Sequence, residues 1–170
     1  MEIAQVAEII GRIADGFEEA CFKCLEENRG IVYQSVLLQL RAGLDQEDIY
    51  LKPTYDDDTY FNEPGKWYKR AYKYKAWKKT IDPPIDNILG FPDRPDHVPN
   101  LYINGQFYDS IQVLRSGDVL EIKTTTAKGK QIVKKYKDRI LGIGPTAVEY
   151  FNSNYMLPAI GAFFRDCGYK

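Results

Sequence analysis

The sequence predicts an α+β fold in which N-terminal helices pack on a small antiparallel β-sheet, a hairpin at about 101–125, with C-terminal helices after it. Three observations predict it: a helical apolar period over residues 3–27, two strand-like runs around the turn residues Gly117 and Asp118, and renewed helical patterns after residue 128. A chain of 170 residues, 44% of them hydrophobic, can build one real core. We therefore expect a single domain, 1–170.

The N-terminal region, 1–43, is predicted to be helical. Apolar residues recur at steps of three and four from Ile3 to Cys24, which indicates an amphipathic helix over 3–27. The Asn-Arg-Gly sequence at 28–30 interrupts this pattern, although a kinked continuation is possible. A second helix follows at about 31–42, and Gly43 is placed to end it.

Residues 44–80 combine an irregular acidic loop with a predicted basic, aromatic helix. Residues 45–63 hold seven acids against one Lys, and residues 66–79 hold seven bases and no acid. In the first turns of that helix the aromatic and the basic residues fall on opposite faces. The predicted aromatic face is Trp67, Tyr68, Ala71, Tyr72 and Tyr74, and the predicted basic face is Lys66, Lys69, Arg70 and Lys73.

The rest of the chain divides into three segments. Prolines make 81–100 an extended connector. The predicted hairpin occupies 101–126, with Phe107, Ile111, Leu120 and Ile122 in the core. Residues 128–168 are expected to be helical, with a short helix ending near residue 142 and a last helix that begins at a capping box at 146–149. Pro158 is expected to kink or divide that last helix.

Composition narrows the functional classes. The formal net charge is −1, which argues for neither a general nucleic-acid binder nor an acidic tail. No run approaches the eighteen or so apolar residues of a membrane span, and the first residues lack the pattern of a signal peptide. Three Cys make no closed disulfide set, so synthesis in a reducing cytosol is expected.

One pattern is typical of a metal-dependent nuclease. Asp109 lies twelve residues before Glu121 across the predicted hairpin, and Lys123 completes a Glu-x-Lys. Restriction-type and RecB-like nucleases hold a metal between such carboxylates and place the Lys near the reacting phosphate, and carboxylate oxygens suit Mg²⁺. The structural alternative is that Glu121 and Lys123 are the outward residues of an alternating strand, and spacing this loose favours it.

Other chemical motifs are incomplete. Cys21 and Cys24 form a C-x-x-C on the apolar stripe of the first helix, with no second pair or His to complete a zinc site, so core packing is expected. His97 is the only histidine and has no obvious nucleophile partner. We therefore predict no catalytic residues, no metal and no cofactor, and a protein that is not an enzyme.

The opposite charges of 45–63 and 66–79 leave three interpretations open. The basic face is a solvated surface, or it contacts the acidic segment of a neighbouring copy, or it binds DNA through phosphates and aromatic stacking. The candidate subunit or DNA contacts are Asp56, Asp57, Asp58, Lys66, Trp67, Lys69, Arg70, Tyr72 and Lys73.

Three short motifs carry a resemblance to a known class of proteins. They are Leu-Lys-Pro-Thr-Tyr at 51–55, Asn-Gly-Gln-Phe-Tyr-Asp-Ser-Ile at 104–111, and Lys-Lys-Tyr-Lys-Asp-Arg-Ile-Leu-Gly-Ile at 134–143. In their order, over about 35–150, the chain resembles small virion structural proteins of tailed bacteriophages, in the tail-completion, head-to-tail connector and virion-morphogenesis group.

This resemblance implies a non-enzymatic component of a phage neck or tail that works as copies in a ring. The implied partners are other copies and neighbouring virion proteins, such as portal, connector or tail components, with possible contact with packaged DNA and no membrane. The implied location is the virion, after synthesis in the host cytoplasm. The metal-dependent nuclease is the first alternative and a DNA-binding accessory protein the second.

Overall fold

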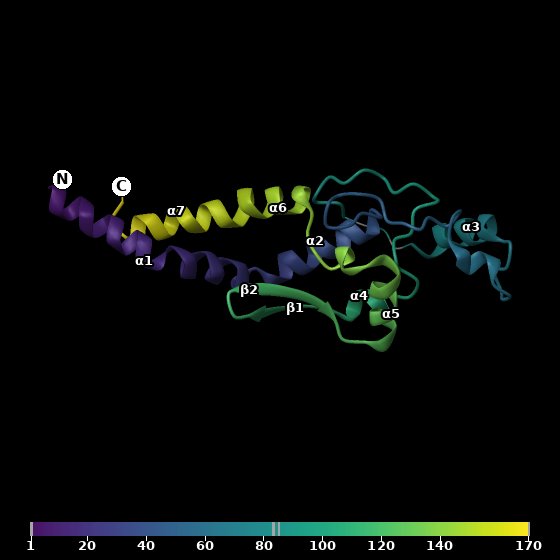
Figure 1. Cartoon of the computed structure of the whole chain (residues 1–170). Helices are drawn as coiled ribbons and strands as arrows, with labels where there is room; N and C mark the ends of the chain where they lie inside the picture. Colours follow the sequence, from purple (N-terminus) through teal and green to yellow (C-terminus); the bar gives the residue numbers. More distant parts are fainter. Residues whose placement is uncertain (1, 83, 85, 170) are drawn as a thin grey trace.

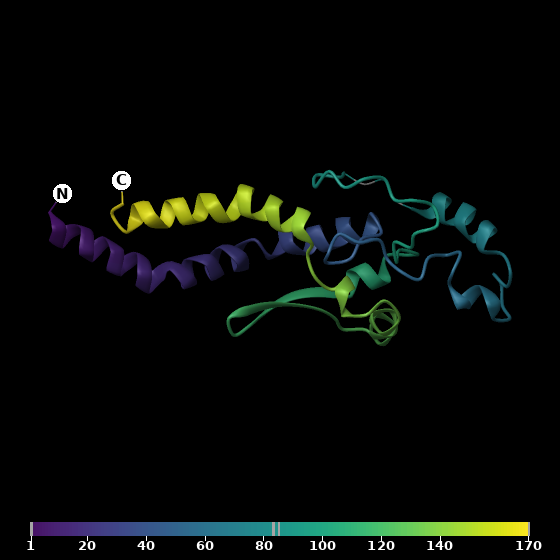
Figure 2. The ribbon, with the colours of Figure 1, turned by 45° about the horizontal axis from the view of Figure 1, so that its top comes forward.

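The computed structural model describes residues 2–82, 84 and 86–169. It is an α+β fold in which helices surround one two-stranded antiparallel sheet, which confirms the predicted fold class. The molecule is elongated (Figure 1): a pair of helices carrying both chain ends forms one end, and α3 lies at the other. Figure 2 shows the same arrangement from a second direction.

Two consecutive helices form the N-terminal half of the fold. The first, α1, spans Ile3–Glu27, and α2 spans Arg29–Arg41. Asn28 joins them with a φ of −108° and a ψ of 23°, and its side-chain Nδ2 donates to the Cys24 carbonyl at 2.8 Å. The predicted interruption is therefore present, and it takes the form of a kink after which the chain continues as a helix.

The end of α2 is a glycine-dependent turn. Gly43 has a φ of +74°, its N–H donates to the Leu40 carbonyl, and the next N–H, of Leu44, donates to Gln39. This is the hydrogen-bond pattern of a Schellman motif. A Cβ at residue 43 would lie 2.5 Å from a methyl of Val98, so both the backbone and the space require glycine.

The middle of the chain contains little regular structure. The short 3₁₀ helix η1 spans Thr59–Asn62, and α3 spans Ala71–Ile81, so the basic segment turns helical only at residue 71. Lys69 has a φ of +52°, which is incompatible with a right-handed helix. The predicted helix from residue 66 is wrong over its first five residues.

The hairpin is shorter than predicted. Strand β1 spans Ile111–Ser116 and β2 spans Val119–Thr124, paired in register from Ile111 opposite Thr124 to Ser116 opposite Val119. Gly117 has a φ of +60°, which suits the first residue of a two-residue hairpin turn. Residues before the strand form the one-turn helix α4, Gln106–Asp109, so an extended strand from residue 101 is wrong.

The C-terminal region is helical, as predicted. Its elements are α5, Ala127–Tyr136; the 3₁₀ helix η2, Asp138–Ile140; α6, Pro145–Phe151; the π-helical segment η3, Asn152–Met156; and α7, Leu157–Asp166. The π-helical turn lies just before Pro158, where the sequence predicted a break.

The predicted capping box does not form. Thr146 lies inside α6, and both its N–H and its hydroxyl donate to Asp48 Oδ2, at 2.9 and 2.7 Å. A carboxylate from a distant loop therefore caps this helix, because Pro145 already begins it and Gly144 leaves room for Asp48.

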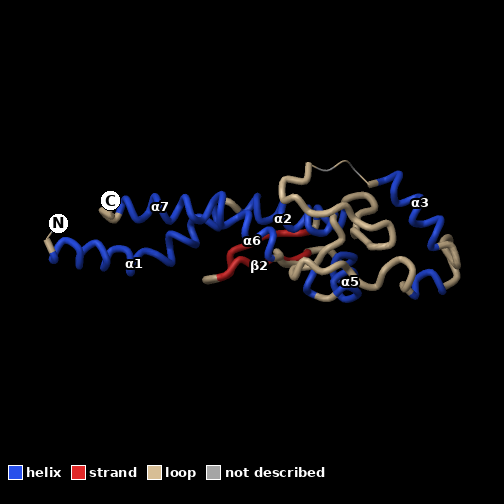
Figure 3. Tube along the Cα trace, turned by 90° about the horizontal axis from the view of Figure 1, so that it is seen from above, coloured by secondary structure: helices blue, strands red, loops and turns tan. Residues whose placement is uncertain are grey.

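The core is built around α2, which packs with the hairpin and α4 in one cluster and with α6 in another. Figure 3 shows α2, α6 and β2 grouped in the middle of the molecule. Phe107 and Ile111 are buried in the central cluster, as predicted, and the half-buried Ile122 packs at its edge. Leu120 is also half-buried but packs against a second cluster of Cys24, Val32 and Phe151. The full central cluster is Val36, Leu40, Leu51, Phe107, Tyr108, Ile111 and Ile140.

Candidate interaction surfaces

The residues of the nuclease pattern do not form a metal site. Asp109 lies on α4 rather than on a strand, while Glu121 and Lys123 lie on β2 and form an ion pair with each other at 2.8 Å. Among the residues that the structure describes, no three His, Cys, Asp or Glu side chains gather where they could hold a metal ion. Glu121 and Lys123 alternate with Leu120 and Ile122, as the structural interpretation expects of them.

The acidic segment 56–58 is used within its own chain. Asp56 pairs with Lys75 at 2.6 Å, and Asp57 accepts a hydrogen bond from the Thr54 hydroxyl at 2.7 Å. Asp58 is buried, caps η1 by accepting from the Tyr60 N–H at 3.0 Å, and pairs with Lys135 of α5. Asp56 and Asp58 hold the loop against α3 and α5, so two of the three carboxylates of the predicted subunit contact are already paired within the chain.

The aromatic residues around α3 form a cluster of their own. Trp67 lies in the turn before the helix, and its ring centroid is 5.3 Å from that of Tyr74 and 5.4 Å from that of Trp77. Lys66 Nζ lies 4.9 Å from the Trp67 ring centroid, within range of a cation–π contact. Sequence reasoning placed Trp67 on the aromatic face correctly, but through helical geometry that the segment does not adopt.

The outer side of this region is basic and exposed. Lys69, Arg70 and Lys73 are exposed and form no ion pair within the described part of the chain, and Tyr72 is 64% exposed beside Lys73. Tyr72 therefore does not share the inward face with Tyr74, contrary to the predicted sorting. We call Lys66, Lys69, Arg70, Tyr72 and Lys73 the basic end.

A buried ion network ties α3 to the proline-rich connector. Lys78 is only 1% exposed; its Nζ lies 2.9 Å from Asp82 Oδ1 and also bonds the Tyr102 carbonyl. Asp82 further accepts from Arg94 and, at 2.9 Å, from Asn100.

The pKa values of this network follow from its burial. Burial lowers the pKa of Lys78, and its contacts with Asp82 oppose part of that shift. Burial alone would raise the pKa of Asp82, but the hydrogen bonds from Lys78 and Asn100 outweigh it and hold that pKa below its ordinary value. Two cations, Lys78 and Arg94, share the one carboxylate of Asp82, and the backbone carbonyls of Tyr102 and Val98 accept further hydrogen bonds from them, so the network ties the backbone of the connector to α3.

The most unusual surface is the pair formed by α1 and α7, which we call the helical arm. α7 runs antiparallel to the N-terminal half of α1, away from the rest of the fold (Figure 1). The rings of Phe17 and Phe164 lie 6.3 Å apart, and a Cβ at Gly16 would come within 2.9 Å of Phe163. Close packing at Gly16 therefore holds the two helices together.

The arm leaves much of its apolar surface uncovered. Ile3 is 89% exposed, Ile10 60% and Leu157 62%, and Val6 and Phe17 are also exposed. The structure describes every residue of α7: Leu157, Pro158, Arg165 and Asp166 are exposed, and residues 159–164 are half-buried. The sequence predicted a helix here without placing its side chains; the lack of any polar residue over 157–164 was the signal of a surface that needs a partner.

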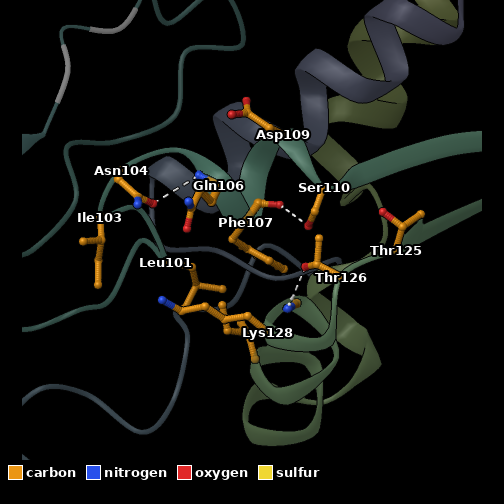
Figure 4. Close-up of a pocket in the computed structure, with 12 residues that line it drawn as sticks. Leu101, Ile103, Asn104, Gln106, Phe107, Asp109, Ser110, Thr125, Thr126 and Lys128 are labelled. Atoms are coloured by element: carbon orange, nitrogen blue, oxygen red, sulfur yellow. Dashed lines mark hydrogen bonds between the residues drawn. The ribbon is translucent and has the colours of Figure 1, made fainter.

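A groove lies between α4 and α5 (Figure 4). Its larger part has a volume of about 500 Å³ and is lined by Leu101, Phe107 and Ile132 together with polar side chains from both helices. A smaller cavity of about 210 Å³ adjoins it and shares Leu101, Ile103, Lys128 and Ile132. We call the two together the α4–α5 groove.

No described helix is both long and apolar enough to cross a membrane. Comparisons with family models, with curated proteins and with solved structures found no match to this chain.

Proposed function

We propose that this chain is a structural protein of a tailed bacteriophage particle, and that it works as one of several copies in a ring at the head-to-tail connection or in the tail. In this role it acts through protein–protein contacts and needs no catalytic site. The short motifs at 51–55, 104–111 and 134–143 suggest the class of protein, and the surfaces of the structure support the mode of action.

The helical arm is the observation that carries the proposal. A helix that is apolar on all sides is normally buried, because exposed apolar surface costs about 25 cal/mol per Å². In α7 Leu157 is 62% exposed and residues 159–164 are only half-buried, and α1 leaves Ile3 and Ile10 largely exposed. A partner that covers the arm accounts for this surface, as in an obligate oligomer.

The distribution of charge supports self-association through two different surfaces. α1 carries six acids and two bases, whereas α5 carries four Lys and no acid, and the basic end lies across the molecule from the arm (Figure 2). A subunit with two unlike, complementary patches makes the heterologous contacts from which rings are built.

The first test is the oligomeric state of the purified chain by sedimentation velocity and negative-stain imaging. We expect a concentration-dependent oligomer with ring-shaped particles. Ile10→Asp should abolish it, because a carboxylate would replace an apolar side chain in the contact. Ile49→Asp is the matched control, since Ile49 is also half exposed but lies on a loop away from the arm, and it should leave the oligomer intact.

A chain that stays monomeric at all concentrations, and that mass spectrometry does not find in purified phage particles, would contradict the proposal. Retention on double-stranded DNA without self-association would instead favour a DNA-binding accessory protein that uses the basic end.

A further inference from the structure

A further cavity lies where the end of α2, the end of α3 and the proline-rich connector meet. Its volume is about 420 Å³, and among the described residues it shares no lining side chain with the α4–α5 groove. Its apolar wall is formed by Leu38, Ala42, Phe91 and Pro92. We call this cavity the Arg41 pocket, because Arg41 lies on its wall.

Arg41, the last residue of α2, has a guanidinium group that its own chain uses little. The Cζ atom lies 5.7 Å from the ring centroids of both Tyr102 and Tyr108. The side chain forms no ion pair with any other described residue, and its Nε is buried without a hydrogen-bond partner. A cation–π contact satisfies no N–H donor, so the donors of Arg41 remain available to a ligand.

The other polar donors of the lining are already used. Arg94 pairs with Asp82, and Asn100 donates to the same carboxylate at 2.9 Å. The Asn87 side chain exchanges two hydrogen bonds with the backbone four residues later, at 2.6 and 3.1 Å. Within the described lining, Arg41 is therefore the cation that can bind an anion without breaking an existing contact.

The charges around the pocket favour an anion with a single charge. Lys78 and Arg94 share the one carboxylate of Asp82, and Arg41 adds a third cation. Asp93 is an exposed second carboxylate of the lining. Three cations against two carboxylates leave one positive charge, which one singly charged anion balances. A doubly charged phosphate would exceed this balance and would be repelled by Asp82 and Asp93.

We propose that the Arg41 pocket binds an organic monocarboxylate whose apolar body lies against Leu38 and Phe91. The planar guanidinium of Arg41 matches the two oxygens of a carboxylate, so the pair can be bidentate. The apolar wall accommodates the rest of the ligand, in the manner of most small-molecule sites. The carboxylate belongs either to a free small acid or to an acidic residue of a neighbouring copy.

The test is isothermal titration calorimetry of the full chain with sodium benzoate at constant ionic strength. We expect benzoate to bind, and benzamide, which has the same ring but no charge, to bind at least tenfold more weakly. Arg41→Gln should raise the benzoate dissociation constant at least tenfold, and Arg41→Lys should raise it less, because lysine keeps the charge but lacks the planar fork. The matched control is Arg29→Gln, an exposed position at the other end of α2, which should leave binding unchanged.

A measurement on the parent chain guards against variants that fail to fold. In proton–nitrogen NMR spectra, saturating benzoate should shift the Arg41 Nε–H signal and the side-chain amide signals of Asn87 and Asn100, which line the pocket. The amide signals of Asn104 and Gln106, in the α4–α5 groove, should not move. Four results would each overturn the proposal: no binding of benzoate up to about 10 mM, equal binding of benzamide, tighter binding of inorganic phosphate, or shifts confined to the groove.

The source of the carboxylate follows from self-association measured with and without saturating benzoate. Weaker association in benzoate would mean that a carboxylate of a neighbouring copy binds in the pocket, and unchanged association would mean a free small acid; both results support the site. The inference goes beyond the proposed function and does not depend on it. A chain that binds benzoate through Arg41 but never associates would overturn the ring proposal and leave the carboxylate site standing.

Discussion

Phe107 illustrates how one side chain connects the hairpin to the helical part of the fold. It lies on α4, just before β1, and its buried ring packs in the cluster that Val36 and Leu40 of α2 also form. The Tyr108 ring next to it is 6.2 Å away, centroid to centroid. The sequence predicted burial of Phe107 from the strand-like run around it, and the burial is correct although the local structure is a helical turn.

Truncating Phe107 should therefore be costly. Phe107→Ala removes a buried aromatic ring and leaves a cavity that the surrounding helices cannot fill, so we expect a loss of about 3–5 kcal/mol in the free energy of unfolding. Urea denaturation followed by circular dichroism measures this. Val119→Ala, at the exposed hairpin turn, should change it by less than about 0.5 kcal/mol. An unchanged midpoint for Phe107→Ala would mean that the ring is not in the core.

At the scale of elements, α3 is held against the neighbouring loops by aromatic packing and by ion pairs between side chains of the same chain. Tyr55, Phe61, Trp67 and Tyr74 meet mostly edge to face. Burial raises the pKa of Tyr74 to about 12 and raises the pKa values of Tyr55, Tyr108 and Tyr136 further, with smaller effects from neighbouring charges. The folded protein therefore favours the neutral form of these four tyrosine side chains.

This packing predicts a loss of stability at alkaline pH. A tyrosine whose pKa is higher in the folded than in the unfolded chain stabilises the fold fully below the unfolded pKa of about 10, and that contribution is lost as pH rises toward the folded pKa. The denaturation midpoint should therefore fall steadily above about pH 10, and part of the tyrosinate absorbance should develop only on unfolding. Tyr74→Phe should make the alkaline decline shallower; an identical decline in this variant would contradict the argument.

Elements with a strong local period could be predicted from the sequence, and those fixed by distant residues could not. The helices at 3–27 and 31–42 have clear apolar periods, and the Gly117 turn is a local signal. The predicted start of α3 was wrong because Lys69 adopts a positive φ, which the apolar period of the sequence does not reveal. The predicted capping box of α6 was wrong because Asp48, almost one hundred residues away in the sequence, caps the helix in place of the Thr146 hydroxyl. The exposure of the arm was missed because an apolar period indicates that a face is covered, but not what covers it.

The whole molecule has unlike ends. The arm is acidic and apolar, while the basic end and three of the four lysines of α5, Lys128, Lys130 and Lys134, form no ion pair among the described residues. In the acidic segment 56–58, which the sequence suggested as the partner of those cations in a neighbouring copy, Asp56 and Asp58 are paired within their own chain. In the proposed assembly, association between copies combines apolar burial at the arm with exposed charge pairs of about 0–1 kcal/mol each.

Salt should weaken the association without abolishing it. Screening shortens the range of exposed charge pairs to about 10 Å at 0.1 M and to about 3 Å at 1 M, but leaves apolar burial in place. Between about 0.05 and 0.5 M NaCl, sedimentation should show the dissociation constant rising and then reaching a plateau. Complete dissociation at about 0.5 M NaCl would mean that charge alone holds the copies together. A dissociation constant that does not change with salt would mean that exposed charges of opposite sign do not meet in the contact.

The kink at Asn28 has a consequence for symmetry. It fixes the direction of α1 relative to α2, and therefore the angle at which the arm leaves the folded body (Figure 1). When one end of each subunit meets the opposite end of the next, that angle is one of the quantities that set the rotation from subunit to subunit, and the chain of contacts closes only if whole steps complete a circle. The backbone conformation of a single asparagine would then help to set how many subunits a closed assembly contains.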